Sequence, residues 1–458
     1  MPWPVDAADI KDIANGAETD FFRLLRCLRR RRRHPCAGAR AREALSPAQP
    51  DMNEANESER RPWAVFLIFL RLGLTSFGGP VAHLGYFHAE FVTRRRWLGE
   101  RAYADLVALC QFLPGPASSQ VGMALGLQRA GYGGALAAWA GFTLPSAVAV
   151  ILFARGLARF GDVLPAGGLH GLKVVAVAVV AQAVWGMAGK LCTDRARISL
   201  MALAACVVLA LPTAWTQIGV IVLAGLAGLA IFTAQANGGA HEPSPVEFEL
   251  RTGAPGARAG WLWLAAFFAL LAGLPLLAAL QPEGWLARVD AFYRAGALVF
   301  GGGHVVLPLL QAEVVPPGWV DNEAFLAGYG AAQAVPGPLF TFAAFLGAAA
   351  GGEYGGWMGG VVCLLAIFAP SFLLVAGALP FWERLRRDRR MQAALAGINA
   401  AVVGLLLAAL YQPVWTNAIH RPQDFALGLV ALVALMSWKW PPWVVVAACG
   451  VAGGVLGA

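Results

Sequence analysis

The sequence predicts an all-α polytopic membrane protein made of two homologous, inverted repeats of about six apolar segments each, plus one spacer helix, with about 10–13 spans. Three observations predict this class. Of the 458 residues, 58% are hydrophobic and only 14% are charged, whereas a soluble domain carries about 25% charge. Apolar runs long enough to cross a hydrocarbon core recur along the chain. The chain also repeats its own motifs in the same order.

Polar stretches divide the chain into five parts. Residues 1–60 form an arginine-rich extension that we expect to be disordered, residues 61–235 the first repeat, 236–260 a polar linker, 261–285 a spacer transmembrane helix and 286–458 the second repeat. The expected apolar segments begin near Trp63, Tyr103, Gly133, Leu169, Arg197 and Thr216, and near Leu286, Glu323, Gly355, Met391, Asp424 and Pro442.

The N-terminal extension does not have the pattern of a signal peptide, because no adequate apolar stretch follows its arginines before Arg61. Met52 is followed by a short polar leader and then by the first apolar run. We therefore expect residues 1–51 to be dispensable. The alternative is a cytoplasmic tail that belongs to the working protein.

The duplication is visible in matched motifs. "RLGLTSFGG", which starts at Arg71, matches "RAGALVFGG", which starts at Arg294. "QFLPGP" and "QAVPGP" follow at residues 111–116 and 333–338, each inside an apolar stretch that a Pro-Gly-Pro triplet should break. "YGG" and then "LPS" in the first half meet "YGG" and "APS" in the second. Because order and spacing are both kept, the halves are copies of one unit.

Charge favours inversion of the second copy. Basic residues in membrane proteins collect in cytoplasmic loops. Arginines crowd residues 94–101 in the first half, while the equivalent loop "VVPPGWVDN" has no basic residue; five arginines at 384–390 give the second half the opposite bias. Basic charge is therefore explained by topology, not by nucleic acid. If a Pro-Gly-Pro segment re-enters the membrane instead of spanning it, the loops that follow lie on the opposite side. The number of crossings therefore stays open.

Broken helices are the expected binding site. In transporters with inverted repeats, substrate binds near the midplane, where discontinuous helices meet. "FGGP" at 77–80 and "FGGGH" at 300–304 supply one break per half, and the Pro-Gly-Pro triplets supply a second. Glycine lets backbone amides turn toward an anion. The alternative is that these residues only permit kinks and close packing. Their duplication in register favours the functional interpretation.

Arg71 and Arg294 form the sharpest candidate pair. Each lies six residues before its "FGG" and in or beside an apolar run, where a guanidinium costs at least about 2.5 kcal/mol. One arginine from each copy would clamp a tetrahedral dianion with forked hydrogen bonds. The alternative is that both side chains reach out to lipid headgroups.

Other polar residues accompany the breaks. Lys173 starts an apolar run and is slightly better explained as a side chain that reaches the interface; Glu90 and Glu313 are duplicated but precede loops. These three are candidates for proton or charge coupling, and solvated helix ends are the alternative. The further candidates for lining the path are His83, Gln111, Ser118, Ser119, Gln120, His304, Gln333 and Thr341. For the two histidines, a satisfied structural role is the commoner outcome.

Enzymatic motifs are missing from the sequence. It contains no hydrolase elbow, HExxH, Walker A or paired-carboxylate arrangement, so we expect neither an enzyme nor an ATPase. The seven cysteines form no close pair of the metal-binding type. We expect no metal and no cofactor.

The motifs resemble those of the chromate ion transporter family in its two-domain form. "RLGLTSFGGPVAHLGYFHAEFV", "QFLPGPASSQVGMALG" and "FGGGHVVLPLLQAEVV" carry the resemblance, which covers essentially all of the chain from Arg61 onward. It implies an inner-membrane bacterial protein that exports chromate by secondary transport and confers resistance, with sulfate as competitor. The family's motif residues correspond here to Arg71, Phe77, Gly78, Gly79, Pro80, His83, Glu90, Pro114, Gly115, Pro116, Phe300, Gly301, Gly302, Glu313, Pro336, Gly337 and Pro338.

Three functions follow as alternatives. The first is a chromate exporter. The second is a carrier of sulfate, molybdate or another oxyanion on the same fold. The third is an anion channel or a membrane-embedded enzyme, although no flavin, NAD or haem motif is present. The expected partners are the substrate anion and the lipid bilayer, with a homodimer left open and no nucleic acid.

Overall fold

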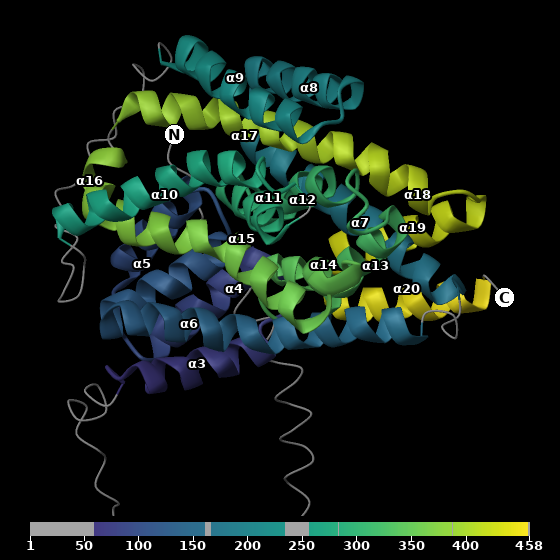
Figure 1. The fold of residues 1–458 in the computed structure, drawn as a ribbon, viewed down its shortest axis with the longest axis horizontal. Helices are drawn as coiled ribbons and strands as arrows, with labels where there is room; N and C mark the ends of the chain where they lie inside the picture. The colour runs from purple at the N-terminus through teal and green to yellow at the C-terminus, as the bar shows by residue number, and fades with distance from the viewer. Residues whose placement is uncertain (1–58, 161–165, 234–255, 283, 387, 457–458) are drawn as a thin grey trace, which may run out of the picture.

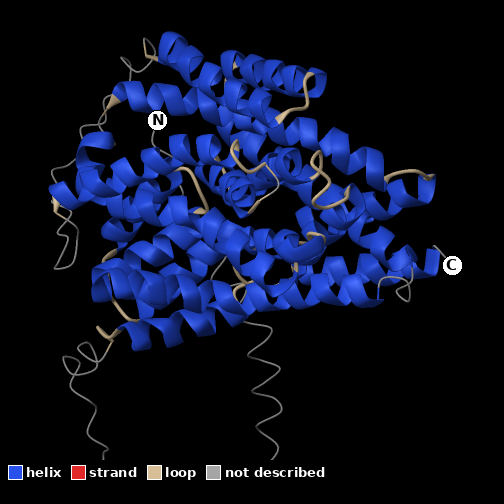
Figure 2. Ribbon diagram, viewed as in Figure 1, coloured by secondary structure: helices blue, strands red, loops and turns tan. Residues whose placement is uncertain are grey.

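The computed structural model describes residues 59–160, 166–233, 256–282, 284–386 and 388–456, and these residues form helices and loops without any strand (Figures 1 and 2). The extension at 1–58, including the question of the start at Met52, and most of the polar linker lie outside the described residues.

The first half runs from a short helix to a pair of apolar helices. Its elements are α3 (Pro62–Thr75), α4 (Gly79–Phe87), η1 (His88–Arg94), α5 (Glu100–Phe112), α6 (Ala117–Phe160), α7 (Ala166–Leu191), α8 (Arg195–Ala210) and α9 (Ala214–Phe232). The spacer helix α10 (Ala257–Ala278) follows.

The second half repeats this order in shorter pieces. Its elements are α11 (Trp285–Ala297), η3 (Gly303–Val305), α12 (Val306–Val314), α13 (Asn322–Ala334), η4 (Leu339–Thr341), α14 (Phe342–Ala349), η5 (Gly352–Tyr354), α15 (Gly356–Ala378), η6 (Leu379–Phe381), α16 (Trp382–Leu385), α17 (Arg389–Ala409), η7 (Leu410–Trp415), α18 (Thr416–Ala418), α19 (Pro422–Met436) and α20 (Pro442–Leu456).

Equivalent helices occupy equivalent places in the two halves. Helices α3 and α11 precede the "FGG" breaks, and α5 and α13 precede the Pro-Gly-Pro triplets. Helix α6 is interrupted at Ala130 and Gly131, whose backbone angles are not helical, and the second half has a full break between α14 and α15 at the matching point. Helix α10 lies between the two halves in chain order.

Six helices among the described residues are long and apolar enough to cross a membrane, fewer than the 10–13 expected spans. They include the predicted runs near residues 169–189, 261–280 and 355–377, and the run at 133–153 lies within α6. Four further apolar helices have fewer than 18 residues. The physical reason is that the glycine and proline breaks shorten several expected segments, because proline lacks an N–H and clashes with the preceding turn.

The two halves exchange helices across the molecule. Helix α7 packs against α19 and α20 of the second half, and its equivalent α17 packs against α8 and α9 of the first (Figure 1). Helix α3 packs on α6 and α11 packs on α15, again in matching pairs. The core therefore forms between the repeats as well as within them.

Glycines let these helices approach at backbone distance. A Cβ placed on Gly171 of α7 would lie 2.1 Å from the carbonyl oxygen of Cys449, and one on Gly397 of α17 would lie 2.1 Å from that of Ala224. Glycine contacts of this kind are common between membrane helices, where the lipid gives no hydrophobic driving force and close packing stabilises association. These two contacts occupy matching positions in the repeat.

We expect Gly397→Val to prevent stable assembly. The new side chain would meet backbone atoms, which cannot move aside. The loss of folding free energy should therefore be at least the roughly 1–3 kcal/mol that an overpacked core usually costs. The measurement is the yield and melting temperature of monodisperse protein in detergent. Gly186→Val is the matched control on α7, because a Cβ there meets nothing within 4 Å. Equal yield and stability of the two variants would contradict the glycine contact.

Candidate functional site

Two reciprocal hydrogen bonds join the repeats at the centre of the fold. The N–H of Gly115 donates to the carbonyl oxygen of Val299 over 2.7 Å, and the N–H of Gly337 donates to that of Ser76 over 2.9 Å. The donors are equivalent to each other in the repeat, and so are the acceptors. We call this region the central seam: the triplets 114–116 and 336–338 together with loops 76–80 and 299–303.

The chemistry of Pro-Gly-Pro explains these bonds. Proline has no backbone N–H, so the glycine carries the only donor in each triplet. Gly115 has φ 123° and Gly337 has φ 109°, which residues with a Cβ rarely adopt. Helix α5 accordingly ends at Phe112 and α13 at Ala334, just before the triplets.

Two serine hydroxyl groups also lie against glycines of the opposite repeat. The hydroxyl oxygen of Ser371 on α15 would lie 2.5 Å from a Cβ on Gly115, and that of Ser146 on α6 would lie 2.7 Å from a Cβ on Gly337. Each serine directly follows a proline inside its helix. The sequence analysis matched "LPS" with "APS" but did not include these serines in the site; the repeated motif is the signal that could have identified them.

Buried polar atoms without a protein partner gather near the seam. They are the hydroxyl oxygens of Ser76, Ser119, Thr143 and Ser371, Oε1 of Gln120 and Nε2 of Gln333. A buried donor or acceptor left unpaired costs about 1–3 kcal/mol. None of these side chains is charged. The seam therefore offers hydroxyl and amide groups to a polar guest without a fixed charge among them.

Other candidates at the seam have at least one partner. His83 is buried with Nδ1 3.4 Å from the Ser118 hydroxyl oxygen, while its Nε2 has no partner among the described residues. His304 Nδ1 lies 2.8 Å from the hydroxyl oxygen of Tyr329. The Thr341 hydroxyl donates to the carbonyl oxygen of Pro338 over 2.9 Å. His304 and Thr341 thus make hydrogen bonds within the protein, whereas one ring nitrogen of His83 is left without a partner among the described residues.

The aromatic and proline members of the "FGG" loops lie at cross-repeat contacts. The Pro80 ring would lie 3.4 Å from a Cβ on Gly303, and Phe77 contacts Trp443 of α20 with ring centroids 6.2 Å apart. Gly78 is exposed, and Phe300 is half-buried.

The two glutamines are not alike. Gln111 is exposed and Gln333 is half-buried, so the structure does not place both in one buried environment. Asn399, the counterpart of Lys173 in the second half, has its Oδ1 3.5 Å from a Cβ built on Gly301. Lys173 itself is buried, and its Nζ lies 3.2 Å from Oε1 of Glu323 at the start of α13.

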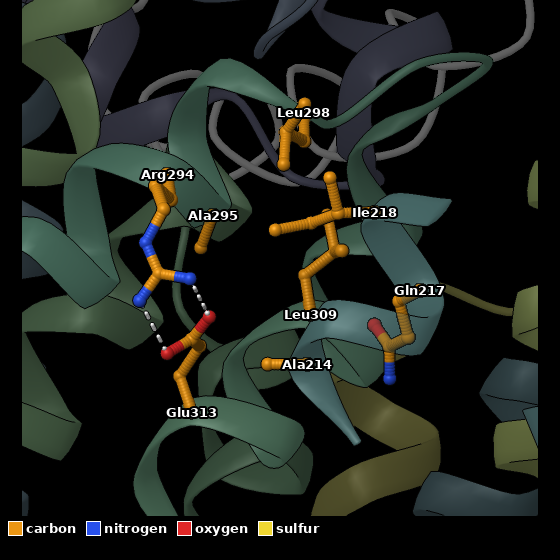
Figure 3. A pocket seen from close by; sticks show the side chains of 8 residues that line it. All are labelled: Ala214, Gln217, Ile218, Arg294, Ala295, Leu298, Leu309 and Glu313. Atoms are coloured by element: carbon orange, nitrogen blue, oxygen red, sulfur yellow. Dashed lines mark hydrogen bonds and ion pairs between the residues drawn. The ribbon is translucent and has the colours of Figure 1, made fainter. Parts of the chain in front are cut away.

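The two arginines occupy different environments. Arg71 is exposed on α3. Arg294 is buried on α11, where its Nη1 lies 2.9 Å from Oε1 of Glu313 (Figure 3). Its Nε donates to Oδ2 of Asp290 over 2.9 Å. Glu90, the counterpart of Glu313, instead accepts hydrogen bonds from two arginines of its own loop, at positions 94 and 95.

Side chains of the kinds that bind metal ions do not cluster in the described part of the chain. Among the described residues, no group of three His, Cys, Asp or Glu side chains is placed to hold a metal ion. The dominant chemistry of the central seam is hydrogen bonding by hydroxyl, amide and backbone groups.

Comparison with known proteins agrees with the sequence motifs. A family model described as chromate transporter matches residues 63–229 and 286–454. The chain is 30% identical to the chromate transport protein of Pseudomonas aeruginosa over 404 residues, covering 85% of this chain and 91% of that protein. It is 28% identical to a probable chromate transport protein of Synechococcus elongatus over 385 residues (81% and 88%), and 27% identical to the chromate transport protein of Cupriavidus metallidurans over 409 residues (86% and 94%). No solved structure matches the chain. The chain belongs to the chromate transporter family, which makes it a transporter and not an enzyme, with one family segment in each half.

Proposed function

We propose that this protein is a secondary active transporter that exports chromate across the bacterial inner membrane and so confers chromate resistance. The observation that carries the proposal is the central seam, where broken helices of both repeats meet around unpartnered polar atoms. The names of the relatives support the choice of substrate. We further propose that the two repeats are inverted, because matching loops carry opposite charge bias.

The chemistry of the seam suits a tetrahedral dianion. Chromate has four oxygen atoms that accept hydrogen bonds and none that donates. Hydroxyl groups such as those of Ser119 and Ser371 can turn their protons toward it. Each hydrogen bond to a charged group contributes about 1.5–3 kcal/mol. The donors at the seam are neutral, so the Arg294 cation adds to binding only when its own carboxylate partners release it.

The membrane potential supplies the free energy for export. Moving one charge across 100 mV is worth about 2.3 kcal/mol, so a dianion that leaves a negative interior releases about 4.6 kcal/mol. This supports a gradient of roughly 2,000-fold, at 1.4 kcal/mol per tenfold. Outward flux of chromate therefore needs no ATP.

The clamp formed by Arg71 and Arg294 stays a proposal. Exposed Arg71 is available to attract an arriving anion. Arg294 is held by two carboxylates, so it contributes to a clamp only after at least one of them moves away or takes up a proton. Sulfate has the same charge and shape as chromate, and a carrier of sulfate or another oxyanion remains the second candidate because neutral donors do not distinguish the two.

Inverted membrane vesicles from cells that express the chain are expected to take up labelled chromate. Uptake should saturate, rise with an inside-positive potential and fall when sulfate is added, because both anions fit the same donors. Vesicles from cells without the chain are the control. Single-channel currents would identify a channel instead. Saturable uptake of sulfate with none of chromate would favour the second candidate.

Ser371→Ala and Ser119→Ala are each expected to weaken chromate binding, because both hydroxyl groups are buried without a partner among the described residues. The hydroxyl of Ser146, in contrast, already donates to the carbonyl oxygen of Thr143. Losing one hydrogen bond to a charged guest raises KM about 10- to 100-fold. Initial uptake rates over a range of chromate concentrations measure KM. Ser437→Ala, at an exposed serine, is the matched control. Normal KM in both seam variants would place the anion elsewhere.

Arg71→Ala and Arg294→Ala are each expected to abolish chromate resistance. Arg71→Ala should leave the amount of inserted protein unchanged because the side chain is exposed, whereas Arg294→Ala leaves two buried carboxylates without their cation. The measurements are growth on chromate and protein level in the membrane. Full resistance in both variants would contradict a role for either arginine.

A further inference from the structure

An ion triad lies beside the "FGGG" break of the second repeat. Arg294 Nη2 lies 2.8 Å from Oδ2 of Asp290, and its Nη1 lies 2.9 Å from Oε1 of Glu313. The side chains of Arg294, Asp290 and Glu313 are 11%, 5% and 13% exposed. Two carboxylates therefore share one guanidinium in a largely buried place, and the triad carries one excess negative charge when both are ionised.

Among the described residues, the helices packed against α11 and α12 supply no second Lys or Arg close to the triad. The titratable group of the adjacent η3 is His304, whose Nδ1 lies 2.8 Å from the Tyr329 hydroxyl oxygen. Helices α9 and α15 carry no Asp, Glu, Lys, Arg or His, and the only charged residue of α10 is Arg258 in its first turn. In α17 the charged residues are arginines at its first two positions. Arg288, also on α11, lies against the rings of Trp319 and Tyr354, 4.7 and 4.2 Å from their centroids. An uncompensated buried charge is costly, and taking up a proton relieves it.

A cavity of about 10 Å³, with room for one water molecule at most, lies beside Glu313. Glu313 and Arg294 line it together with Gln217 of α9 (Figure 3). Gln217 is only 4% exposed, and its Oε1 has no partner among the described residues. An unpaired acceptor on the same cavity as a carboxyl group is placed to accept a hydrogen bond from a protonated acid or from water between them.

The Arg294–Glu313 pair bridges the two helices on either side of a seam loop. Arg294 stands in the last turn of α11, before the loop, and Glu313 lies on α12, after it. Leu298 lines the cavity and directly precedes Val299, whose carbonyl oxygen accepts the hydrogen bond from Gly115. The ion pair therefore fixes the loop that forms half of the central seam.

We propose that Glu313 carries the proton whose uptake and release is coupled to opening of the central seam. Ionised Glu313 holds α12 to Arg294 and keeps the loop in place. When a proton from water binds a Glu313 oxygen, Asp290 and Arg294 remain as a neutral pair, and α12 is freed from α11. The proton returns to water when the loop closes again. This inference rests on the proposed transport function and adds the coupling site to it.

The coupling site belongs to one repeat. The position equivalent to Asp290 is Leu67, and Glu90 is bound by arginines of its own loop. A single excess carboxylate predicts that one titrating group governs the response to pH.

The test uses purified full-length protein in liposomes, with the potential clamped by valinomycin and potassium. The variants are Glu313→Gln and, as a control at an exposed carboxylate, Glu353→Gln. Chromate counterflow at equal pH measures exchange, and uptake with and without a pH gradient measures coupling. We expect Glu313→Gln to keep counterflow and lose the effect of the gradient, while Glu353→Gln behaves as the parent protein.

Four results would overturn the proposal. A parent protein with counterflow but no response to the gradient would leave the transport function standing and remove the coupling. A normal response in Glu313→Gln would move the proton elsewhere. Absence of counterflow in the parent protein would contradict the transport function itself. If Glu313→Gln is not recovered folded, the infrared carbonyl band of a protonated carboxyl group is followed in the parent protein and in Glu313→Asp, and an unshifted band also rejects the assignment.

Discussion

The fold depends on one backbone hydrogen bond made twice: a glycine N–H between two prolines donates to a carbonyl oxygen of the opposite repeat. The prolines remove the other donors and end the preceding helices, so this amide must find a partner outside its own helix. The partner is a loop that is itself broken by glycines. Gly115 and Gly337 are thus placed against Ser371 and Ser146, and the polar atoms of both repeats are brought together at one place.

Equal sequence does not give equal environment here. Arg71 and Arg294 occupy the same motif position, yet the first is exposed and the second lies between two carboxylates. The difference has a local cause. Asp290, one turn before Arg294, has Leu67 as its counterpart, and Glu90 has arginines four and five residues along its own chain. A duplicated framework therefore carries a single buried ion triad, which allows the two copies to take different roles.

Much of the architecture could be predicted from the sequence, because apolar length and helix breakers are local properties. The runs near 169–189 and 261–280 are helices, and both Pro-Gly-Pro triplets end a helix where expected. Six of the described helices are long and apolar enough to span, against about 10–13 expected spans, since several breaks fall inside apolar runs. The pairing of Gly115 with Val299 could not be predicted, because it depends on how distant loops meet. Asp290 and Arg294 are one turn apart and can be paired from helix periodicity alone, but Asp290 has no acidic counterpart in the first repeat, so matched positions do not reveal it.

Glycine contacts leave almost no layer of side chains between the paired helices. At Gly171 and Gly397 the backbone of one helix touches the backbone of the next, as Gly73 and Gly296 do on α6 and α15. Side chains of different shape can slide past one another, but two peptide backbones in contact resist shear. Each such pair should therefore move as one rigid body. The angular change of a transport cycle must then be concentrated at a few φ and ψ torsions in the interrupted segments.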